Sequence, residues 1–317
     1  MRTPLEPLPA ELDRYSRQIR FAGIGEAGQR ALLGSRAVLC GCGALGTVLA
    51  ETLVRSGVGF LRIIDRDFVE WSNLQRQVLF DEDDVRQQLP KVVAAAKKLA
   101  AINSTVTIEP VVADVNHHNI RELVADADVI LDGLDKFETR FLINDVALDL
   151  GKPWVYGGCV GSHGQTMTII PGETACLRCV IESPPEPGAA ETCDTAGVIA
   201  PAIQVVASLE AVAALKLLSG QRHLIEPTLT IVDVWEGTHR SIRLDNMGDR
   251  SNCPACGQGR RDWLHGDATS QTTVLCGRNA VQVTPASPAM QDLAALSARW
   301  QSLGTVTANP FLARLRV

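Results

Sequence analysis

The sequence predicts an α/β protein in which a Rossmann-like, mainly parallel sheet carries helices on both faces. Short apolar runs alternate with helical stretches from about residue 10 to about residue 245, which is typical of βαβ units. A G-x-G-x-x-G turn, Gly41 to Gly46, links the first apolar run to a helical stretch. The second apolar run ends in an acidic residue, Asp65, as in dinucleotide-binding domains.

The elements follow one another in βαβ order along the chain. Most of the predicted strands are short apolar runs, and the predicted helix at 137–151 is amphipathic and ends at a glycine. The first expected elements are a strand at 37–40, a helix from the glycine turn to about 56, a strand at 59–65, a helix from about 90 to 102 and a strand at 104–111. They are followed by a strand within 126–135, a helix at 137–151, two strands within 153–172, a Pro- and Gly-rich loop at 182–197 and an apolar helix near 201–218.

The amino-acid composition changes near residue 262 and divides the chain into two parts. We expect one large domain over 10–262, followed by a linker and a small C-terminal extension over 263–317. Within the extension the pattern predicts one strand and one helix, the helix at about 288–302.

The composition narrows the function classes. The chain has 317 residues, 46% of them hydrophobic and 21% charged, with a net charge of −6. This balance argues against nucleic acid as a partner, because such binding neutralises phosphates with basic residues. The N-terminal stretch lacks the apolar core of a signal peptide, and Gln204, Glu210 and Lys216 interrupt the most apolar segment. We therefore expect a buried helix there, no membrane partner and a cytoplasmic location.

The glycine turn indicates a phosphate site at the start of a helix. Gly41, Gly43 and Gly46 allow backbone N–H groups to approach an anionic phosphate, whichever molecule carries it. Asp65 lies about twenty residues further on and suits a ribose hydroxyl. These four residues predict an adenosine nucleotide, and both NAD and ATP fit.

A polar set after Asp65 favours ATP over NAD. Hydride transfer needs an apolar slot for the nicotinamide, whereas nucleotidyl transfer needs groups that stabilise charge on the leaving pyrophosphate. A carboxylate after the next strand suits magnesium bound to phosphates, and we assign this role to Asp135. The candidate phosphate-binding residues are Asn73, Arg76, Gln77 and Lys91. Taken singly, Arg76 and Lys91 are also explained as solvated surface charges.

Four cysteines in two C-x-x-C pairs predict a structural zinc site. The pairs are Cys176 with Cys179 and Cys253 with Cys256. Four thiolates close a tetrahedral site and leave no position for catalysis. A redox-active C-x-x-C is the alternative, but the sequence shows no thioredoxin-like context around either pair. We expect the zinc ion to tie together distant segments of the chain.

Cys193 is a candidate nucleophile. It lies at the end of the Pro-rich loop, shortly before an apolar helix, where the pKa of a thiol is often lowered. An unreactive loop cysteine is an equally good interpretation. The other cysteines lie in apolar or glycine-rich surroundings and are expected to be small core residues. They are Cys40, Cys42, Cys159 and Cys276.

Several further motifs occur in a characteristic order over about residues 13–257. They are RYSRQI, GCGALG, DFVEWSNLQRQVLF, LPKVVAAA, LDGLDKFETRFLIND, CLRC, TCDTAGVIAP, LEAVAALKLLSG and CPACG. In these motifs the chain resembles the MoeB/ThiF family, the bacterial relatives of ubiquitin-activating enzymes. The resemblance covers about four-fifths of the chain.

The resemblance implies an adenylyltransferase that uses ATP and Mg²⁺. In this family the C-terminal glycine carboxylate of a ubiquitin-like sulfur carrier, which ends in Gly-Gly, attacks the α-phosphate. The products are a carrier acyl-adenylate and pyrophosphate, ahead of thiocarboxylate formation. The tail is too short for the rhodanese domain of some relatives, so the resemblance implies a separate sulfur donor, a cysteine desulfurase or a rhodanese.

The same resemblance assigns roles to individual residues. Arg17 matches an arginine that reaches the ATP site of a partner subunit, which implies a homodimer. Cys193 matches a position that is covalently linked to the carrier or to sulfur in some members and is dispensable in others. The matched nucleotide-site residues are Gly41, Gly43, Gly46, Asp65, Asn73, Arg76, Gln77, Lys91 and Asp135, and the matched zinc ligands are Cys176, Cys179, Cys253 and Cys256.

Two other functions remain as alternatives. An NAD(P)-dependent oxidoreductase has the same glycine turn and the same acidic residue after the second strand. A non-catalytic ATP-binding scaffold has the same nucleotide site but predicts binding without turnover.

Overall fold

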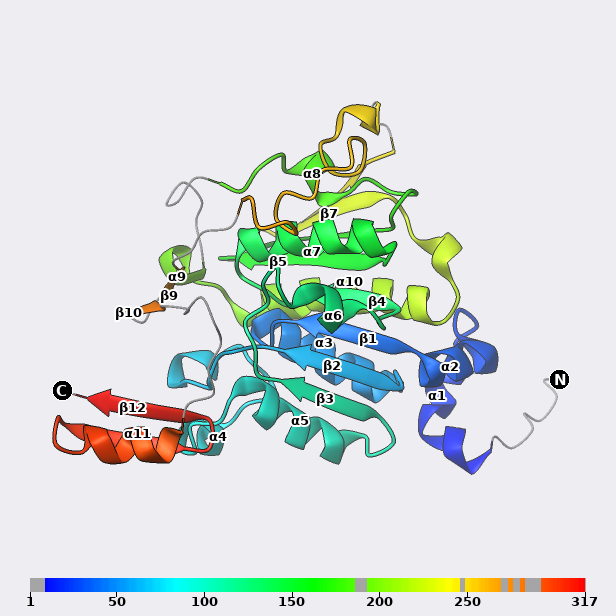
Figure 1. Ribbon diagram of the computed structural model, residues 1–317. Helices are drawn as coiled ribbons and strands as arrows, with labels where there is room; N and C mark the ends of the chain where they lie inside the picture. Colours follow the sequence, from blue (N-terminus) through cyan, green and yellow to red (C-terminus); the bar gives the residue numbers. More distant parts are fainter. Residues whose placement is uncertain are drawn as a thin grey trace.

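The structure, a computed structural model, describes residues 9–185, 193–245, 249–268, 273–275, 280–282 and 292–316. Its centre is an eight-stranded sheet in the order β3-β2-β1-β4-β5-β6-β7-β8 (Figure 1). The strands are β1 (Arg36–Cys40), β2 (Phe60–Ile64), β3 (Thr107–Val111), β4 (Val129–Asp132), β5 (Trp154–Val160), β6 (His163–Ile169), β7 (Thr228–Asp233) and β8 (Thr238–Arg243).

The sheet is mostly parallel, as the sequence predicts. The five strands from β3 to β5 run parallel, and β6, β7 and β8 are added antiparallel at the other side. The order 3-2-1-4-5 reverses direction between β1 and β4. Ligands of open α/β sheets bind outside the carboxyl ends of the strands at such a switch point.

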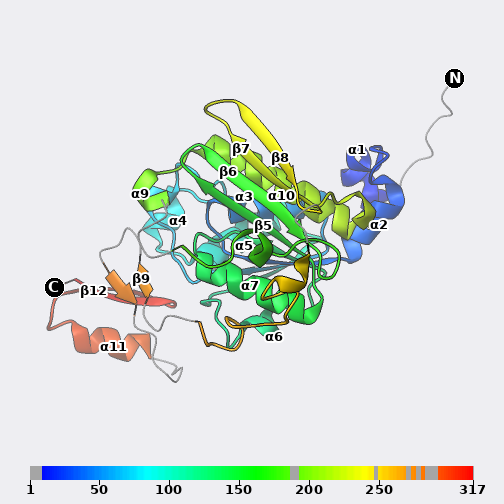
Figure 2. The same ribbon diagram turned by 90° about the horizontal axis from the view of Figure 1, so that it is seen from above.

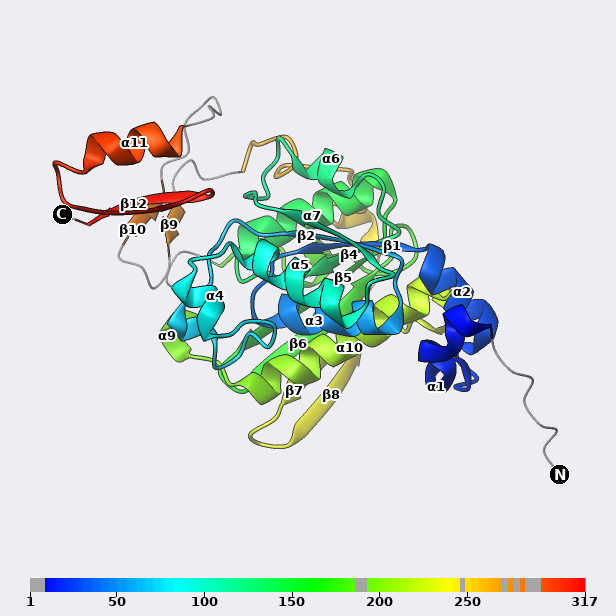
Figure 3. The same ribbon diagram turned by 90° about the horizontal axis from the view of Figure 1, so that it is seen from below.

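Helices cover both faces of the sheet. Figure 3 shows α3 (Ala44–Ser56), α5 (Lys91–Ile102) and α10 (Ala200–Leu218) on one face. It shows α6 (Ile120–Val124) and α7 (Phe137–Leu150) on the other. The shorter helices are α1 (Ser16–Ile19), α2 (Gly25–Gly34), α4 (Glu82–Arg86), α8 (Leu177–Val180) and α9 (Cys193–Ala196), and 3-10 turns lie at η1 (Ala10–Tyr15), η2 (Trp71–Asn73), η3 (Arg222–Leu224) and η4 (Arg250–Asn252).

Two hydrophobic cores lie on the two faces, and β1 contributes to both. Successive side chains of a strand point to opposite faces. Ala37 and Leu39 accordingly pack into the core beneath α3, α5 and α10. Val38 and Cys40 pack into the core beneath α6 and α7. A strand that is apolar at every position is therefore buried on both sides, which explains the continuous apolar run in the sequence.

The apolar segment near residues 201–218 is a core helix, and that prediction is confirmed. Among the described helices, only α10 is long and apolar enough to cross a membrane by length and composition. Its residues Ile203, Val206, Ala207 and Ala211 belong to the core on the α3 face of the sheet. The apolar character of α10 is thus explained by packing.

The sequence pattern does not mark the outer edge of the sheet. Figure 2 shows β7 and β8 as a hairpin that extends from the side of the molecule. All six residues of β8 are exposed, so β8 has no apolar alternation from which it is recognisable. Its strand conformation comes from the pairing with β7.

The C-terminal extension contains more strand than predicted. The helix is confirmed as α11 (Leu293–Trp300). The prediction of a single strand was wrong, because the described residues form β9 (Thr273–Leu275), β10 (Ala280–Gln282), β11 (Thr305–Asn309) and β12 (Leu312–Arg316). These strands form two antiparallel pairs, β9 with β10 and β11 with β12. Strands of only three to five residues are too short to give a clear pattern in the sequence, and they depend on pairing with their partners.

Candidate active site and metal centre

The glycine turn connects β1 to α3 at the carboxyl edge of the sheet. Gly41 has φ +96°, a left-handed conformation that favours glycine. A Cβ on Gly41 would lie 2.5 Å from the backbone oxygen of Gly133, so the two loops touch at this point. Gly43 is the N-cap of α3, and no side chain in the described part of the chain caps that helix end. The first N–H groups of α3 are therefore available to an anion.

Asp65 fixes the glycine turn to the end of β2. One carboxylate oxygen accepts a hydrogen bond from the backbone N–H of Cys42 at 2.7 Å. The other accepts from the N–H of Asp67, also at 2.7 Å. Each oxygen retains a second lone pair, so the carboxylate still has capacity for a ribose hydroxyl.

Lys91 lies next to this acidic segment, at the first position of α5. Its side chain is 8% exposed, and its Nζ is 3.2 Å from a carboxylate oxygen of Asp67. Burial lowers the pKa of Lys91, but the negative charges of Asp65 and Asp67 outweigh burial and raise the pKa above its ordinary value. Lys91 therefore carries a positive charge beside the glycine turn. It is not one of the solvated surface charges that the sequence left as an alternative.

The segment between β2 and α5 also brings amides toward the turn. Asn73 is buried, and its side-chain oxygen accepts from the N–H of Glu70 at 3.1 Å. Gln77 is also buried, and its Nε2 is 4.0 Å from the position that a Cβ on Gly43 would take. The Oε1 of Gln77 has no hydrogen-bond partner among the described residues. A buried amide with an unsatisfied oxygen beside a phosphate-type turn is suited to contact a ligand.

Arg76 is half-buried on the same segment. Its guanidinium donates to the carbonyl of Ser72 at 2.8 Å. The structure thus places Arg76 next to Gln77 in the sequence, and this guanidinium contact is local, to a residue four positions earlier in the chain.

Asp135 is carried to the turn by the loop between β4 and α7. The N–H of Gly133 donates to the carbonyl of Cys40 at 2.8 Å, which joins this loop to the end of β1. Asp135 follows two residues later and is exposed. An exposed carboxylate next to a phosphate-type turn has the donor chemistry that Mg²⁺ prefers.

A buried ion pair supports the Asp135 loop, and sequence reasoning missed it. The Nε of Arg140 on α7 donates a hydrogen bond to the Asp132 carboxylate at 2.8 Å. Its Nη2 donates to two backbone carbonyls, those of Leu134 at 2.6 Å and Gly157 at 2.8 Å. Burial lowers the pKa of Arg140, but Asp132 outweighs it and raises the pKa, so the guanidinium is charged. The available signal was an arginine directly before the apolar run Phe141–Ile143.

A second buried acid, Glu210 on α10, was also missed as a feature of the site. Its carboxylate lies against the backbone of Gly157 on β5. Neither carboxylate oxygen has a hydrogen-bond partner among the described residues. Burial, and to a lesser extent Asp132, raises the pKa of Glu210 well above its ordinary value, so the enclosure of this carboxyl group favours its neutral form.

Arg17 lies far from the glycine turn of its own chain. It is exposed on α1, and the neighbouring Gln18 donates to the carbonyl of Ser56 at the C-terminal end of α3. The glycine turn is at the other end of α3, whose 13 residues span about 20 Å. Figure 1 accordingly shows α1 beside α2, away from the end of the molecule where α4 lies. The structure does not bring Arg17 together with the other predicted site residues.

Cys193 is placed only through its backbone. It is the first residue of α9, at the same end of the molecule as α4 (Figures 1 and 3). The Cys193 side chain lies outside the part that the structure describes, as does Cys276. Cys40 and Cys42 are fully buried, which confirms them as core residues, and Cys159 is half-buried.

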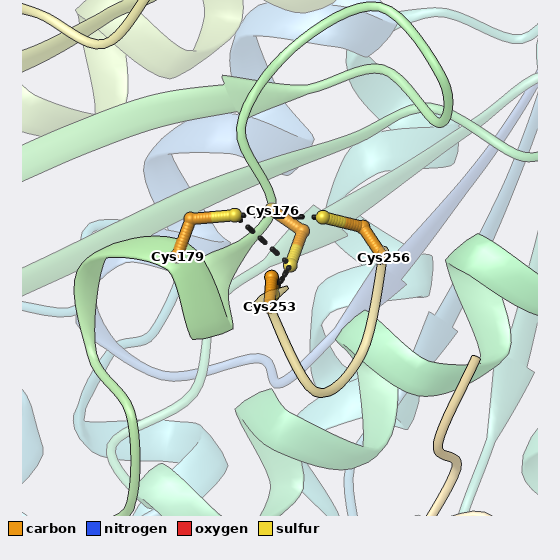
Figure 4. Close-up of side chains that lie close together, drawn as sticks. All are labelled: Cys176, Cys179, Cys253 and Cys256. Carbon is orange, nitrogen blue, oxygen red and sulfur yellow. Dashed lines mark hydrogen bonds between the residues drawn. The ribbon is translucent and has the colours of Figure 1, made fainter. Parts of the chain in front are cut away.

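The four paired cysteines form one cluster. Their sulfur atoms all lie within 4.8 Å of one another, and Figure 4 shows the side chains of the two pairs facing each other. The Sγ–Sγ distances are 3.8 Å for Cys176–Cys179, 3.6 Å for Cys176–Cys253 and 3.5 Å for Cys179–Cys256. A tetrahedral zinc with bonds of about 2.3 Å separates its sulfur ligands by about 3.8 Å. The donor set and its dimensions therefore fit a structural zinc ion.

The cysteine cluster joins the chain after β6 to the chain after β8. Its surroundings are fixed to α7, because the N–H of Leu177 donates to Asn144 at 2.9 Å and the N–H of Trp263 donates to Asp145 at 3.1 Å. The ring of Trp263 also packs on Phe141, with 4.5 Å between ring centroids. The cluster thus stabilises the face of the sheet that carries Arg140.

The fold and the site define a class of protein, namely a nucleotide-binding α/β protein of the Rossmann type with a separate four-cysteine centre. A model of the ThiF family matches residues 15–255. The chain is 47% identical over 304 residues to the sulfur carrier protein ThiS adenylyltransferase of Bacillus subtilis, covering 96% of this chain and 89% of that protein. The chain therefore belongs to the ThiF family, and it is an adenylyltransferase.

Other similar proteins extend the comparison. The chain is 39% identical over 252 residues to the SAMP-activating enzyme E1 of Haloferax volcanii, covering 80% of this chain and 91% of that protein. The crystal structure of Escherichia coli MccB with ATP has a TM-score of 0.65 at 25% identity, covering 79% of this chain and 76% of that chain. The matched family residues lie within the range predicted for the first domain, whose boundary at 262 stays a prediction.

Proposed function

We propose that this chain uses Mg-ATP to adenylylate the C-terminal glycine carboxylate of a ubiquitin-like sulfur carrier protein. The carboxylate oxygen of the carrier attacks the α-phosphorus of ATP, the bond from that phosphorus to the β-phosphate oxygen breaks, and pyrophosphate leaves. The product is a carrier acyl-adenylate, ahead of thiocarboxylate formation. The 47% identity to a ThiS adenylyltransferase supports this choice of substrate.

The observation that carries the proposal is the charged Lys91 held beside the glycine turn. A buried cation at that place stabilises the negative charge that develops on the pyrophosphate. In the proposed assignment Gly41, Gly43 and Gly46 present backbone N–H groups, while Asp65 binds the ribose. Asn73, Arg76 and Gln77 contact phosphates together with Lys91. An oxidoreductase would share the glycine turn and Asp65 but has little use for the further groups on Asn73, Arg76, Gln77 and Lys91, so this set favours ATP over NAD.

Asp135 is the residue that we propose to hold Mg²⁺ on the phosphates. When bound, the ion supplies charge neutralisation for the phosphate oxygens. Asp135 itself orients the triphosphate through that contact. The loop that carries it is held to the glycine turn through Gly133 and to α7 through Leu134.

We propose a homodimer in which Arg17 reaches the partner's nucleotide site. Arg17 is exposed and lies away from the site of its own chain, as this role requires. The helix α10 also leaves Val205 and Val212 exposed, seven residues apart and so on one side of the helix, where a partner subunit would cover them. Both features support the dimer.

The later steps need other proteins. We propose that sulfur comes from a separate donor, a cysteine desulfurase or a rhodanese, and that Cys193 takes part only in this transfer. We place the reaction in the cytoplasm, because a reducing compartment keeps cysteines as thiols, the form in which the four clustered cysteines would bind zinc.

The test is ATP–pyrophosphate exchange with purified protein, measured with and without a carrier that ends in Gly-Gly. We expect exchange only when the carrier is present, and no exchange when its last glycine is removed. The variant Asp135→Ala should abolish exchange, whereas the control Glu226→Ala, on an exposed side chain, should leave it unchanged. Nucleotide binding without any exchange would instead support the scaffold alternative, and exchange that ignores the carrier would contradict the proposed substrate.

A further inference from the structure

The C-terminal extension lies at the same end of the molecule as α4 and the proposed nucleotide site (Figure 1). Figures 1 and 3 show α11 and β12 on the same side as α4, away from α1 and α2. The extension reaches the first domain through Asn309, the last residue of β11. The Nδ2 of Asn309 donates to the carbonyl of Gln88 at 2.9 Å and lies 3.5 Å from that of Gln87.

Asn309 is itself held in place by the hairpin turn. Its Oδ1 accepts from the N–H of Phe311 at 2.9 Å, which is the geometry of an Asx turn. The amide nitrogen therefore projects from a fixed turn, with its donors directed at the chain of the first domain.

The contacted segment, Gln87–Lys91, is unusual in its backbone. Gln88 has φ +51° and is the only residue other than glycine with a positive φ in the described part of the chain. A glutamine in this conformation is disfavoured and persists only where its surroundings fix it. The Asn309 amide supplies such a contact, because it satisfies the carbonyl of Gln88.

The same segment leads directly to the charged lysine of the site. Its other side is fixed to the chain after β2, because Val69 N–H donates to Leu89 at 3.0 Å and Lys91 N–H donates to Asp67 at 2.8 Å. The segment Gln87–Lys91 therefore lies between the C-terminal hairpin and the acidic segment beside the glycine turn. Its last residue places the Lys91 side chain against Asp67.

We propose that the C-terminal hairpin is part of the nucleotide site and that Asn309 is a positioning residue for Lys91. The side chain of Asn309 holds Gln88 in its left-handed conformation, and this fixes the path of the chain into α5. The inference rests on the proposed function only in taking ATP as the ligand of the site.

The experiment measures the affinity of Mg-ATP for the full-length protein by calorimetry, without any carrier. Asn309→Ala should weaken ATP binding about two- to tenfold, the range expected for the loss of one hydrogen bond. Asn309→Asp keeps the acceptor for Phe311 but loses the donor to Gln88, so it should weaken binding as much as Asn309→Ala. The control Thr307→Ala, exposed on β11, should leave the affinity unchanged.

A second readout separates positioning from a general loss of structure. In exchange assays Asn309→Asp should raise the KM for ATP and leave the KM for the carrier and the midpoint of thermal unfolding unchanged. Wild-type ATP affinity in Asn309→Ala, or in Asn309→Asp alone, would overturn the proposal. Because binding is measured without a carrier, this result is independent of whether exchange requires one.

Discussion

Asp132 and Arg140 form an ion pair that is enclosed by protein directly beside the loop carrying Asp135. Their side chains are 0% and 6% exposed, and the Nε–Oδ2 distance is 2.8 Å. The pair links the end of β4 to α7, and the same guanidinium binds the carbonyls of Leu134 and Gly157. The backbone of the Asp135 loop is thus fixed by a charged group that is almost entirely buried.

The first prediction concerns the loss of that cation. Arg140→Met leaves Asp132 buried without a counter-charge and leaves two backbone carbonyls without a donor. Breaking a buried pair from one side costs about 3–5 kcal/mol, so we expect the free energy of unfolding to fall by that amount. Chemical denaturation of the purified variant measures it.

A surface pair on the same face provides the matched control. Arg121 pairs with Asp149 at 2.6 Å, but its side chain is 52% exposed. Exposed pairs contribute about 0–1 kcal/mol, so Arg121→Met should change the free energy of unfolding by no more than that. Equal effects of the two variants would contradict a structural role for the buried pair.

The second prediction concerns the buried lysine. Lys91→Met removes the positive charge beside the glycine turn and should lower the rate of carrier-dependent ATP–pyrophosphate exchange about a hundred- to a thousandfold. Lys97→Met, on the exposed face of the same helix, should leave the rate unchanged. The rate of pyrophosphate incorporation into ATP measures both. If Lys91→Met exchanged pyrophosphate at the wild-type rate, Lys91 would have no role in the reaction.

The parallel sheet and the glycine turn were predictable because each has a strong local signal. Strands buried on both faces are apolar at every position, and the turn has glycines at fixed spacing. The edge strand β8, whose six residues are all exposed, and the short strands of the extension have no such signal and depend on pairing with a neighbouring strand. Their existence depends on neighbours that the sequence pattern does not reveal.

The site residues that belong to a sequence motif could be predicted, whereas those whose role depends on tertiary packing could not. Lys91 was expected at the site, but its burial against Asp67 depends on how the chain returns from α4 to α5. Arg140 and Glu210 are charged residues within helices that bury much of their surface, and periodicity alone does not say what surrounds them. Their roles depend on β4 and β5, which lie elsewhere in the sequence.

The third prediction concerns the cysteine cluster. Cys253→Ser removes one of four zinc ligands, so the protein should lose its single equivalent of zinc, measured by elemental analysis after dialysis. Because the metal joins two distant segments, the thermal midpoint should fall on the order of 10 °C, at about 2–4 °C per kcal/mol for a domain of this size. The control Cys159→Ala, outside the cluster, should retain zinc. Full zinc content in Cys253→Ser would contradict the assignment.

The fourth prediction concerns the pH dependence of stability. Burial raises the pKa of Glu210 well above its ordinary value, so the folded protein binds a proton that the unfolded chain releases at lower pH. The stability from neutral Glu210 is fully present below the ordinary pKa and is lost as the pH rises through the raised folded pKa. Over that interval the wild type should lose up to about 1.4 kcal/mol per pH unit relative to a variant that cannot ionise.

Glu210→Gln is that variant, since glutamine is close in shape to the neutral acid. Denaturation of both proteins between pH 5.5 and 9.5 should show the free energy of unfolding of the wild type falling relative to Glu210→Gln as the pH increases. Glu226→Gln, at a carboxylate that is 68% exposed, should follow the wild type at every pH. If the difference in free energy of unfolding between the wild type and Glu210→Gln stayed constant with pH, Glu210 would have the same pKa in the folded and unfolded states. That result would contradict the raised pKa expected from its burial against Gly157.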